Sequence, residues 1–221
     1  MPIPNASPRR IALGLLLLAT CAHAAADTTL SRFYGGAAIG VGNQDVSAFE
    51  SAARNNLEYR DVKSDEYQPY YKLFFGVRPS SLVDLELFLS NLGTFKTRGS
   101  NSAVENLPDG QYSTRATALG GDVRFKLGSI PSRRYGLVDG TTPFVTIGYY
   151  RARQRAGLRV GAFSSFDTSE RSAAKLGAGL ATNIDNDWNL IYGMEYYDRL
   201  GERDESGAGR FVAVYVGLQR R

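Results

Sequence analysis

YYKLFFGVRPSSLVDLELFLSNLGTFK, the stretch at residues 70–96, contains the pattern that decides the fold. Along each of its two arms every second residue is bulky and uncharged, and the positions between them hold the charged residues. A repeat of two residues is typical of β-strands, because successive side chains of a strand point to opposite faces of a sheet. The stretch therefore predicts a hairpin with one largely aliphatic face and one charged face.

A turn centred on Ser80 predicts the register of this hairpin. The pairs expected on the aliphatic face are Val77 with Val83, Phe75 with Leu85, Leu73 with Leu87 and Tyr71 with Leu89. On the other face, Phe74 is expected opposite Glu86. Lys72 then lies diagonal to Glu86, within reach of a long side chain.

The first 26 residues have the three parts of a secretion signal. Arg9 and Arg10 precede an apolar run at residues 11–18, and small residues follow as far as Ala24. Cleavage after Ala24 fits the A-x-A pattern, whereas a lipoprotein-type cleavage that would retain Cys21 fits less well. The run is too short for a spanning helix. The sequence thus predicts a cleaved signal peptide at residues 1–24 and one domain at residues 25–221.

Removal of this signal restricts the chemistry that remains. Cys21 and His23 are the only cysteine and histidine in the chain, so the exported domain lacks Cys–His catalytic pairs, the usual zinc ligand sets and disulfides. Loss of Arg9 and Arg10 lowers the formal charge from +4 to 4 − 2 = +2, which does not indicate a nucleic-acid partner. We predict a non-enzymatic protein with no catalytic residue, metal or cofactor.

Eight stretches have the two-residue repeat. They lie at residues 32–41, in the two arms of the hairpin, and at residues 113–127, 144–155, 171–182, 188–199 and 211–218. The connections between them are long at residues 43–66, 98–111 and 157–169, short at 79–81 and 183–187, and intermediate at 128–142 and 200–209. An even number of strands and a general alternation of long and short connections are expected of outer-membrane barrels. Within the first long connection, residues 48–57 predict a short helix.

The fold class that follows is all-β, an eight-stranded antiparallel up-and-down transmembrane β-barrel. Each arm of the hairpin has about the 9–11 residues that a tilted strand needs to cross the hydrocarbon. Its aliphatic face is expected to meet lipid and its charged face to line the lumen. A soluble periplasmic ligand-binding barrel, with apolar residues inside, is the alternative left open.

Several short pieces resemble one family. VDLEL at residues 83–87 and LGTFK at 92–96 are similar to the third-strand signature of the outer membrane protein A transmembrane domain and its opacity-type relatives, as are FYGG at 33–36 and KLFFGVR at 72–78. The resemblance implies a small outer-membrane barrel of the Gram-negative cell envelope, in contact with lipid and lipopolysaccharide and inserted by the outer-membrane assembly machinery.

The same resemblance implies an envelope-stabilising or adhesin-like role. The chain is expected to lack the peptidoglycan-binding module of longer members, because no second domain follows the eighth strand. It also ends in GLQRR at residues 217–221, where such barrels usually end on an aromatic residue, which weakens the expected recognition by the assembly machinery.

Charged residues of inward parity predict a network inside the barrel. They are Lys72, Arg78, Asp84, Glu86, Asp122, Arg124, Lys126, Lys175, Glu195 and Arg199. A barrel of eight strands is only about wide enough to be filled by its own side chains, so we favour a plug of ion pairs. A small porin-like diffusion channel is the alternative.

A row of arginines predicts a contact outside the barrel. Arg151, Arg153 and Arg155 continue the outward parity of their strand beyond the expected membrane edge. Guanidinium groups suit phosphate, so lipopolysaccharide phosphates are the expected ligand, and a solvated loop base is the alternative. Specificity for a surface ligand, whose identity the sequence does not name, is expected in the long connections. A monomer is expected.

Overall fold

The computed structural model describes residues 32–45, 59–102, 108–128, 140–200 and 209–220. The strands are β1 (Phe33–Gln44), β2 (Tyr59–Ser64), β3 (Tyr67–Val77), β4 (Val83–Ser102), β5 (Gly110–Lys126), β6 (Thr141–Val160), β7 (Phe163–Asn183), β8 (Trp188–Leu200) and β9 (Gly209–Arg220). The predicted signal peptide and the predicted helix at 48–57 lie outside the described residues. Within the described ranges, no helix is long and apolar enough to span a membrane.

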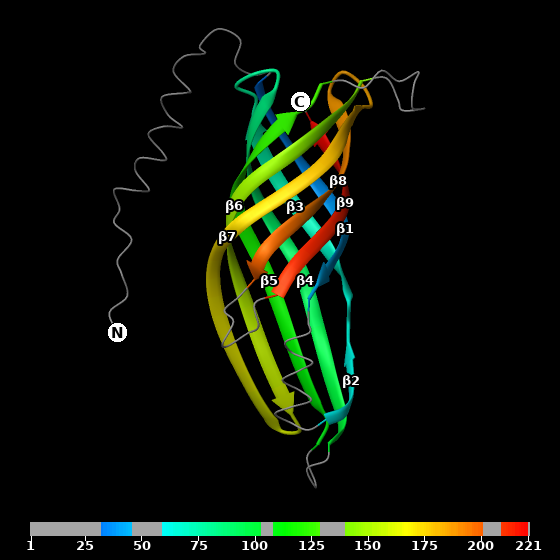
Figure 1. Cartoon of the computed structure of the whole chain (residues 1–221), viewed down its shortest axis with the longest axis vertical. Coiled ribbons are helices and arrows are strands. Elements are labelled where there is room, and N and C mark those ends of the chain that lie inside the picture. The colour runs from blue at the N-terminus through cyan, green and yellow to red at the C-terminus, as the bar shows by residue number, and fades with distance from the viewer. Residues whose placement is uncertain (1–31, 46–58, 103–107, 129–139, 201–208, 221) are drawn as a thin grey trace, which may run out of the picture.

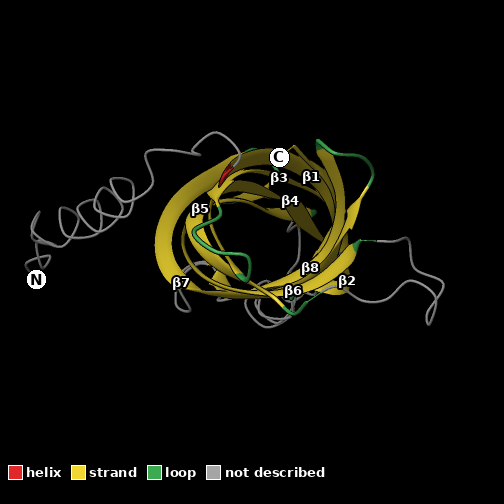
Figure 2. Cartoon of the chain, turned by 90° about the horizontal axis from the view of Figure 1, so that it is seen from above, coloured by secondary structure: helices red, strands yellow, loops and turns green. Residues whose placement is uncertain are grey.

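The strands close into an antiparallel barrel, seen from the side in Figure 1 and from above in Figure 2. Their order around the ring is β4–β3–β1–β9–β8–β7–β6–β5, and β5 pairs again with β4. Eight positions in the ring confirm the predicted eight-stranded up-and-down barrel. Closure pairs the backbone groups of each strand on both sides, which is what the hydrocarbon of a membrane requires.

The ninth strand, β2, does not add a position to the ring, because it lies in line with β3 along the same edge of β4. It pairs only with the far end of β4, as far as Ser64 opposite Thr97. β3 occupies the same edge of β4 from Tyr71 opposite Asn91 onward. The prediction of a loop over residues 43–66 is therefore wrong for β2.

One side of the barrel is much taller than the other. β4 to β7 have 20, 17, 20 and 21 residues, whereas β1, β8 and β9 have 12, 13 and 12. Figure 1 shows these long hairpins at the bottom, opposite the C-terminus. The loops predicted at 98–111 and 157–169 are wrong over much of their length, because only Gly161 and Ala162 separate β6 from β7. Outside a membrane both faces of a strand can be polar. The apolar repeat of these long strands therefore stops at the membrane edge, although their backbone hydrogen bonds continue.

The outward side chains form an apolar band. Leu73, Leu87 and Val214 are 60%, 61% and 61% exposed. From β4 round to β9, outward residues lie opposite one another on neighbouring strands and form a continuous row. The row consists of Leu85, Val123, Ile147, Leu176, Tyr196 and Val212. Soluble monomers rarely expose so continuous an apolar surface. The soluble alternative, with apolar residues inside, is wrong because the aliphatic residues are outside and the charged residues are inside.

The hairpin of residues 70–96 has the predicted faces in a different register. Phe74 pairs with Phe88 instead of Glu86. Ser80 Oγ accepts hydrogen bonds from two backbone N–H groups just after it, and the turn occupies residues 78–82. The register is therefore shifted by two residues, which keeps every side chain on its predicted face.

A bulge in β4 marks the height at which the tall side begins. The β4–β5 ladder shifts between Asn91 and Thr94. Gly93 has a φ of +89°, and its N–H donates to Asn91 Oδ1 at 3.0 Å. A Cβ at Gly93 would lie 2.6 Å from Gln68 Cβ. Both the dihedral angle and the close approach thus require glycine.

We expect Gly93→Ala to lower the free energy of unfolding by at least about 2 kcal/mol, because it adds a collision to backbone strain. Gly128→Ala is a matched control: Gly128 has a φ of +90° and no atom within 4 Å of its Cβ position, so about 1 kcal/mol is expected. Urea unfolding in lipid vesicles, followed by Trp188 fluorescence, measures both. Equal losses would contradict the role of the Gln68 contact.

Candidate functional site

Five strands each place one charged side chain at the middle of the lumen. We call this group the ionic layer: Lys72 of β3, Glu86 of β4, Asp122 of β5, Lys175 of β7 and Glu195 of β8. Lys72 Nζ lies 2.7 Å from Glu86 and 2.8 Å from Glu195. Lys175 Nζ lies 2.6 Å from Asp122 and 3.0 Å from Glu195. All five side chains are at most 2% exposed.

Glu195 is the residue that connects most of these partners. Its Oε1 accepts hydrogen bonds from Lys72 and Lys175, at 2.8 and 3.0 Å. Its Oε2 accepts from the hydroxyls of Tyr70 and Tyr197, at 2.7 and 2.9 Å. Both carboxylate oxygens thus have two donors, which compensates the cost of burying the charge.

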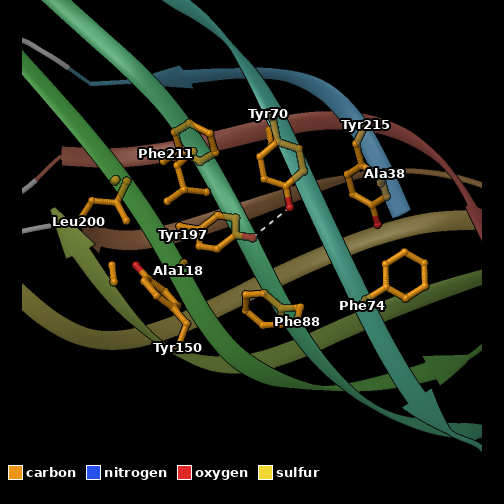
Figure 3. Packing of buried hydrophobic residues seen from close by; sticks show 14 of the residues in the cluster. Ala38, Tyr70, Phe74, Phe88, Ala118, Tyr150, Tyr197, Leu200, Phe211 and Tyr215 are labelled. Carbon is orange, nitrogen blue, oxygen red and sulfur yellow. Dashed lines mark hydrogen bonds between the residues drawn. The ribbon is translucent and has the colours of Figure 1, made fainter. Parts of the chain in front are cut away.

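An aromatic layer covers the ionic layer on the side of the long hairpins. Its members are Tyr70, Phe88, Phe95, Tyr150, Tyr197 and Phe211, all at most 3% exposed. Tyr197 is central (Figure 3): its ring centroid lies 5.1 Å from that of Tyr150 and 5.7 Å from that of Phe211. The hydroxyl oxygens of Tyr70 and Tyr197 lie 3.1 Å apart, next to the carboxylate oxygen that accepts from both. Aromatic pairs at such distances add to the stability of the packing.

The two-residue repeat predicted charged residues inside the barrel but did not predict this aromatic layer. The sequence did contain a signal for it. Tyr70 lies two residues from Lys72, and Tyr197 lies two residues from Glu195, so each ring points to the same inward face as its charged neighbour. The space for the rings comes from glycines on neighbouring strands. A Cβ at Gly42 would lie 2.1 Å from the Phe211 ring, and a Cβ at Gly120 would lie 2.8 Å from the Phe88 ring.

A second charged group lies toward the end with the short turns. Arg124 binds Glu86 at 2.6 Å and so joins this group to the ionic layer. Lys126 Nζ lies 2.7 Å from Asp84 Oδ1. The guanidinium of Arg78 is 4.9 Å from the Tyr34 ring centroid. The structure thus brings nine of the ten predicted lumen residues into these two groups.

Arg199 is the exception, and its predicted inward position is wrong. Its side chain is 63% exposed and its Nε lies 3.3 Å from Asp198. The β8–β9 ladder shifts between Tyr197 and Leu200, and Arg199 has a φ of +57°. This irregularity breaks the alternation that had assigned Arg199 to the lumen.

The predicted arginine row lies on the outer face of the tall side. Arg151 and Arg153 are each 70% exposed and lie near Glu170 of β7, to which Arg151 is hydrogen-bonded. The Arg155 guanidinium is 4.9 Å from the Phe166 ring centroid. Arg115 of β5 lies directly opposite Arg155. It belongs to the same surface, which we call the arginine belt: Arg115, Arg151, Arg153 and Arg155.

The charged groups of the lumen compensate one another. In the ionic layer, each carboxylate lies within ion-pair distance of a cation. Across the residues that the structure describes, no cluster of three or more His, Cys, Asp or Glu side chains could hold a metal ion.

Comparisons with known proteins agree with this architecture. Residues 12–220 match the family model described as the outer membrane protein beta-barrel domain. A comparison with curated protein sequences finds no match.

Solved structures of outer-membrane barrels are similar at low identity. Ail of Yersinia pestis is 13% identical, with a TM-score of 0.46 over 86% of this chain and 97% of that chain. Neisserial surface protein A is 14% identical, with a TM-score of 0.47 over 85% and 96%. OprG of Pseudomonas aeruginosa is 11% identical, with a TM-score of 0.47 over 85% and 93%.

We expect Glu195→Gln to lower the free energy of unfolding by about 3–5 kcal/mol, because Lys72 and Lys175 lose the charge they share. Asp84→Asn is the matched control. Its partner Lys126 is 23% exposed and can turn to water, so a loss of about 1 kcal/mol is expected. Urea unfolding in vesicles measures both variants, and similar small losses would show that the ionic layer contributes little to stability.

Proposed function

The chain belongs to the outer membrane protein β-barrel domain family, and we propose that it is a closed, non-conducting barrel that presents a rigid surface outside the cell. Its place is the bacterial outer membrane, and its role is in the envelope. The short turns face the periplasm and the long hairpins face outward, as in other barrels of this membrane. The proposal includes the absence of an enzymatic reaction.

The observation that carries the proposal is the double closure of the lumen. The ionic layer brings opposite charges within 3.0 Å of one another from five strands. The aromatic layer lies directly outside it, and Tyr70 and Tyr197 donate to Glu195 from that side. An ion crossing the barrel would have to displace both layers. The paired charges therefore support a plug more than the alternative, a small diffusion channel.

The tall side supplies the proposed interaction surface. β4 to β7 extend well beyond β1, β8 and β9, and they remain hydrogen-bonded as a sheet. The β6–β7 ladder runs from Thr141 opposite Thr182 to Val160 opposite Phe163 without a register shift. Such a sheet presents side chains in fixed positions and loses little conformational entropy when a partner binds.

The arginine belt is the proposed lipopolysaccharide contact. It begins next to the apolar band, because Arg151 follows the outward Tyr149 by two residues and pairs with Leu119. Arg115 and Arg155 lie directly opposite each other, an arrangement of like charges that destabilises a sheet unless an anion compensates it. A phosphate of the outer leaflet can bridge the two guanidinium groups. Glu170 is the competing acid within the belt.

We expect the wild-type protein to show no defined unitary conductance in planar lipid bilayers at neutral pH, because both layers block the lumen. The same preparation must migrate on gels as a heat-modifiable folded barrel. A reproducible conductance that disappears when a lumen position is filled, as in Ala38→Trp, would contradict the plug and favour the diffusion channel. Ala38 is inward and 3% exposed.

We expect lipopolysaccharide co-purification to fall by on the order of tenfold when Arg115, Arg151, Arg153 and Arg155 are all replaced by Gln, because charge-assisted contacts are lost. Arg220→Gln is the control, since Arg220 is outward at the periplasmic end. Glu170→Gln should retain or increase the bound lipopolysaccharide. Mass spectrometry of the purified protein measures the ratio, and an unchanged ratio in the fourfold variant would refute the contact.

A further inference from the structure

The outer face of the tall side contains a half-open groove beyond the arginine belt, on the long β6–β7 hairpin at the bottom of Figure 1. Its volume is about 330 Å³, within the range of roughly 300–1,000 Å³ that is usual for small-molecule sites. Among the residues that line it are Gln111, Ser113, Gly157, Arg159, Ser164 and Phe166. None of these six belongs to the charged groups of the lumen or to the belt.

The register of the strands explains why a groove forms at this place. Ser113 of β5, Gly157 of β6 and Phe166 of β7 lie directly opposite one another in an outward row. Gly157 has no side chain, so the row has a gap at its middle. A Cβ at Gly157 would lie 2.8 Å from Phe166 Cδ1 and 3.3 Å from Ser113 Oγ. The aromatic ring therefore packs beside the bare backbone of Gly157, and the groove lies next to it.

Phe166 supplies an aromatic surface in this groove. The residue is 63% exposed, although the Arg155 guanidinium lies 4.9 Å from its ring centroid and Gly157 lies below its edge. The face of an aromatic ring is flat and apolar and carries partial negative charge. Such a face attracts the C–H groups of a sugar ring, whose hydroxyl groups remain free at the ring edge to form hydrogen bonds.

Polar side chains surround this aromatic surface. Gln111, Ser113 and Ser164 are uncharged, and Arg159 is the one charged residue that lines the groove in the part of the chain that the structure describes. All four side chains are partly or fully exposed, and none of them hydrogen-bonds to another described residue. Sugar hydroxyls both donate and accept, as do amide and hydroxyl side chains. The lining thus matches a neutral sugar better than a phosphate.

The position of the groove along β6 indicates the source of such a sugar. Arg151 begins the belt next to the apolar band, and Gly157 follows it by six residues. This separation is roughly 20 Å along a strand, and less in height because barrel strands tilt by about 35–45°. In lipopolysaccharide the phosphates lie at the membrane surface and the core sugars extend outward from them. A molecule whose phosphates contact the belt therefore carries its core sugars past the groove.

We propose that this groove binds one neutral hexose of the lipopolysaccharide core in the same membrane. The hexose stacks on Phe166 and forms hydrogen bonds with Ser113 and Ser164. This inference rests on the lipopolysaccharide contact proposed for the arginine belt, and it extends that contact from phosphate to sugar. The groove gives the protein a preference for lipopolysaccharide with a complete core, which contacts to phosphate alone do not provide.

Affinity measurements with two lipopolysaccharides of equal phosphate content test the proposal. One has a complete core, and the other ends at the phosphorylated inner core and lacks the outer hexoses. Microscale thermophoresis of the full barrel in lipid nanodiscs measures both dissociation constants. We expect the complete form to bind about tenfold more tightly, because it adds a stacking contact and hydrogen bonds. A ratio of the two constants near one would overturn the proposal.

Three variants assign this preference to the groove. Phe166→Ala removes the aromatic surface and should bring the ratio close to one. Gly157→Ala should also lower the ratio, because the added methyl group displaces the Phe166 ring. Phe163→Ala is the matched control and should keep the full ratio, since Phe163 is 62% exposed on the same strand and does not line the groove. A full ratio in both groove variants, or an equal loss in Phe163→Ala, would contradict the assignment. Heat-modifiable migration on gels confirms that each variant is folded.

A double variant, Arg151→Gln with Arg153→Gln, separates the sugar site from the belt. It should weaken the binding of both lipopolysaccharides by a similar factor and leave their ratio unchanged. If it weakens neither, the phosphate contact fails, while a ratio that depends on Phe166 still supports the sugar site. If it weakens both but Phe166→Ala keeps the wild-type ratio, the sugar site fails and the phosphate contact stands. Absence of binding by the wild-type protein would overturn both.

Discussion

The interior of this barrel depends on the need to compensate one buried carboxylate, that of Glu195. Lys72, Lys175, Tyr70 and Tyr197 all donate to it, so a single side chain ties together β3, β7 and β8. Its two oxygens face two different layers, one ionic and one aromatic. A buried charge is tolerated only when its partners are in place, and two of the partners here, Tyr70 and Lys72, come from β3, which is distant in the sequence. The partners of Glu195 meet only when the strands have closed into a ring, so formation of the barrel and filling of the lumen depend on each other.

A second constraint acts on the outside, where lipid can satisfy no backbone group. It requires a closed ring over the height of the apolar band, but it does not apply above that band. There β4 to β7 continue while the other strands end. The change of environment also explains the side chains: outward residues are aliphatic within the band and become arginines just beyond it on β6. The buried ion pairs thus lie in the lumen, and the outer surface of the tall side is the proposed interaction surface.

Particular residues show how far the sequence pattern reaches. Lys72 and Glu86 could be placed in one lumen from parity alone, although the predicted register of their hairpin was wrong by two residues. Parity failed for Arg199, because the irregularity at the end of β8 breaks the alternation. It also did not detect β2 or the extended β6–β7 hairpin, since strands with water on both sides need no apolar repeat. The Arg115–Arg155 pair required knowledge of which residues on neighbouring strands lie opposite each other.

The sequence by itself determined the eight-stranded barrel, its lipid-facing side and nine of the ten charges assigned to its lumen, because a two-residue repeat assigns each side chain to one face. Only the tertiary structure decided which charges meet, how the aromatic rings pack in the lumen, where the bulges lie and that a cavity lined by Arg124 remains. The physical reason is that parity is a local property of one strand. Ion pairs, ring packing and cavities depend on the register between strands that are distant in the chain.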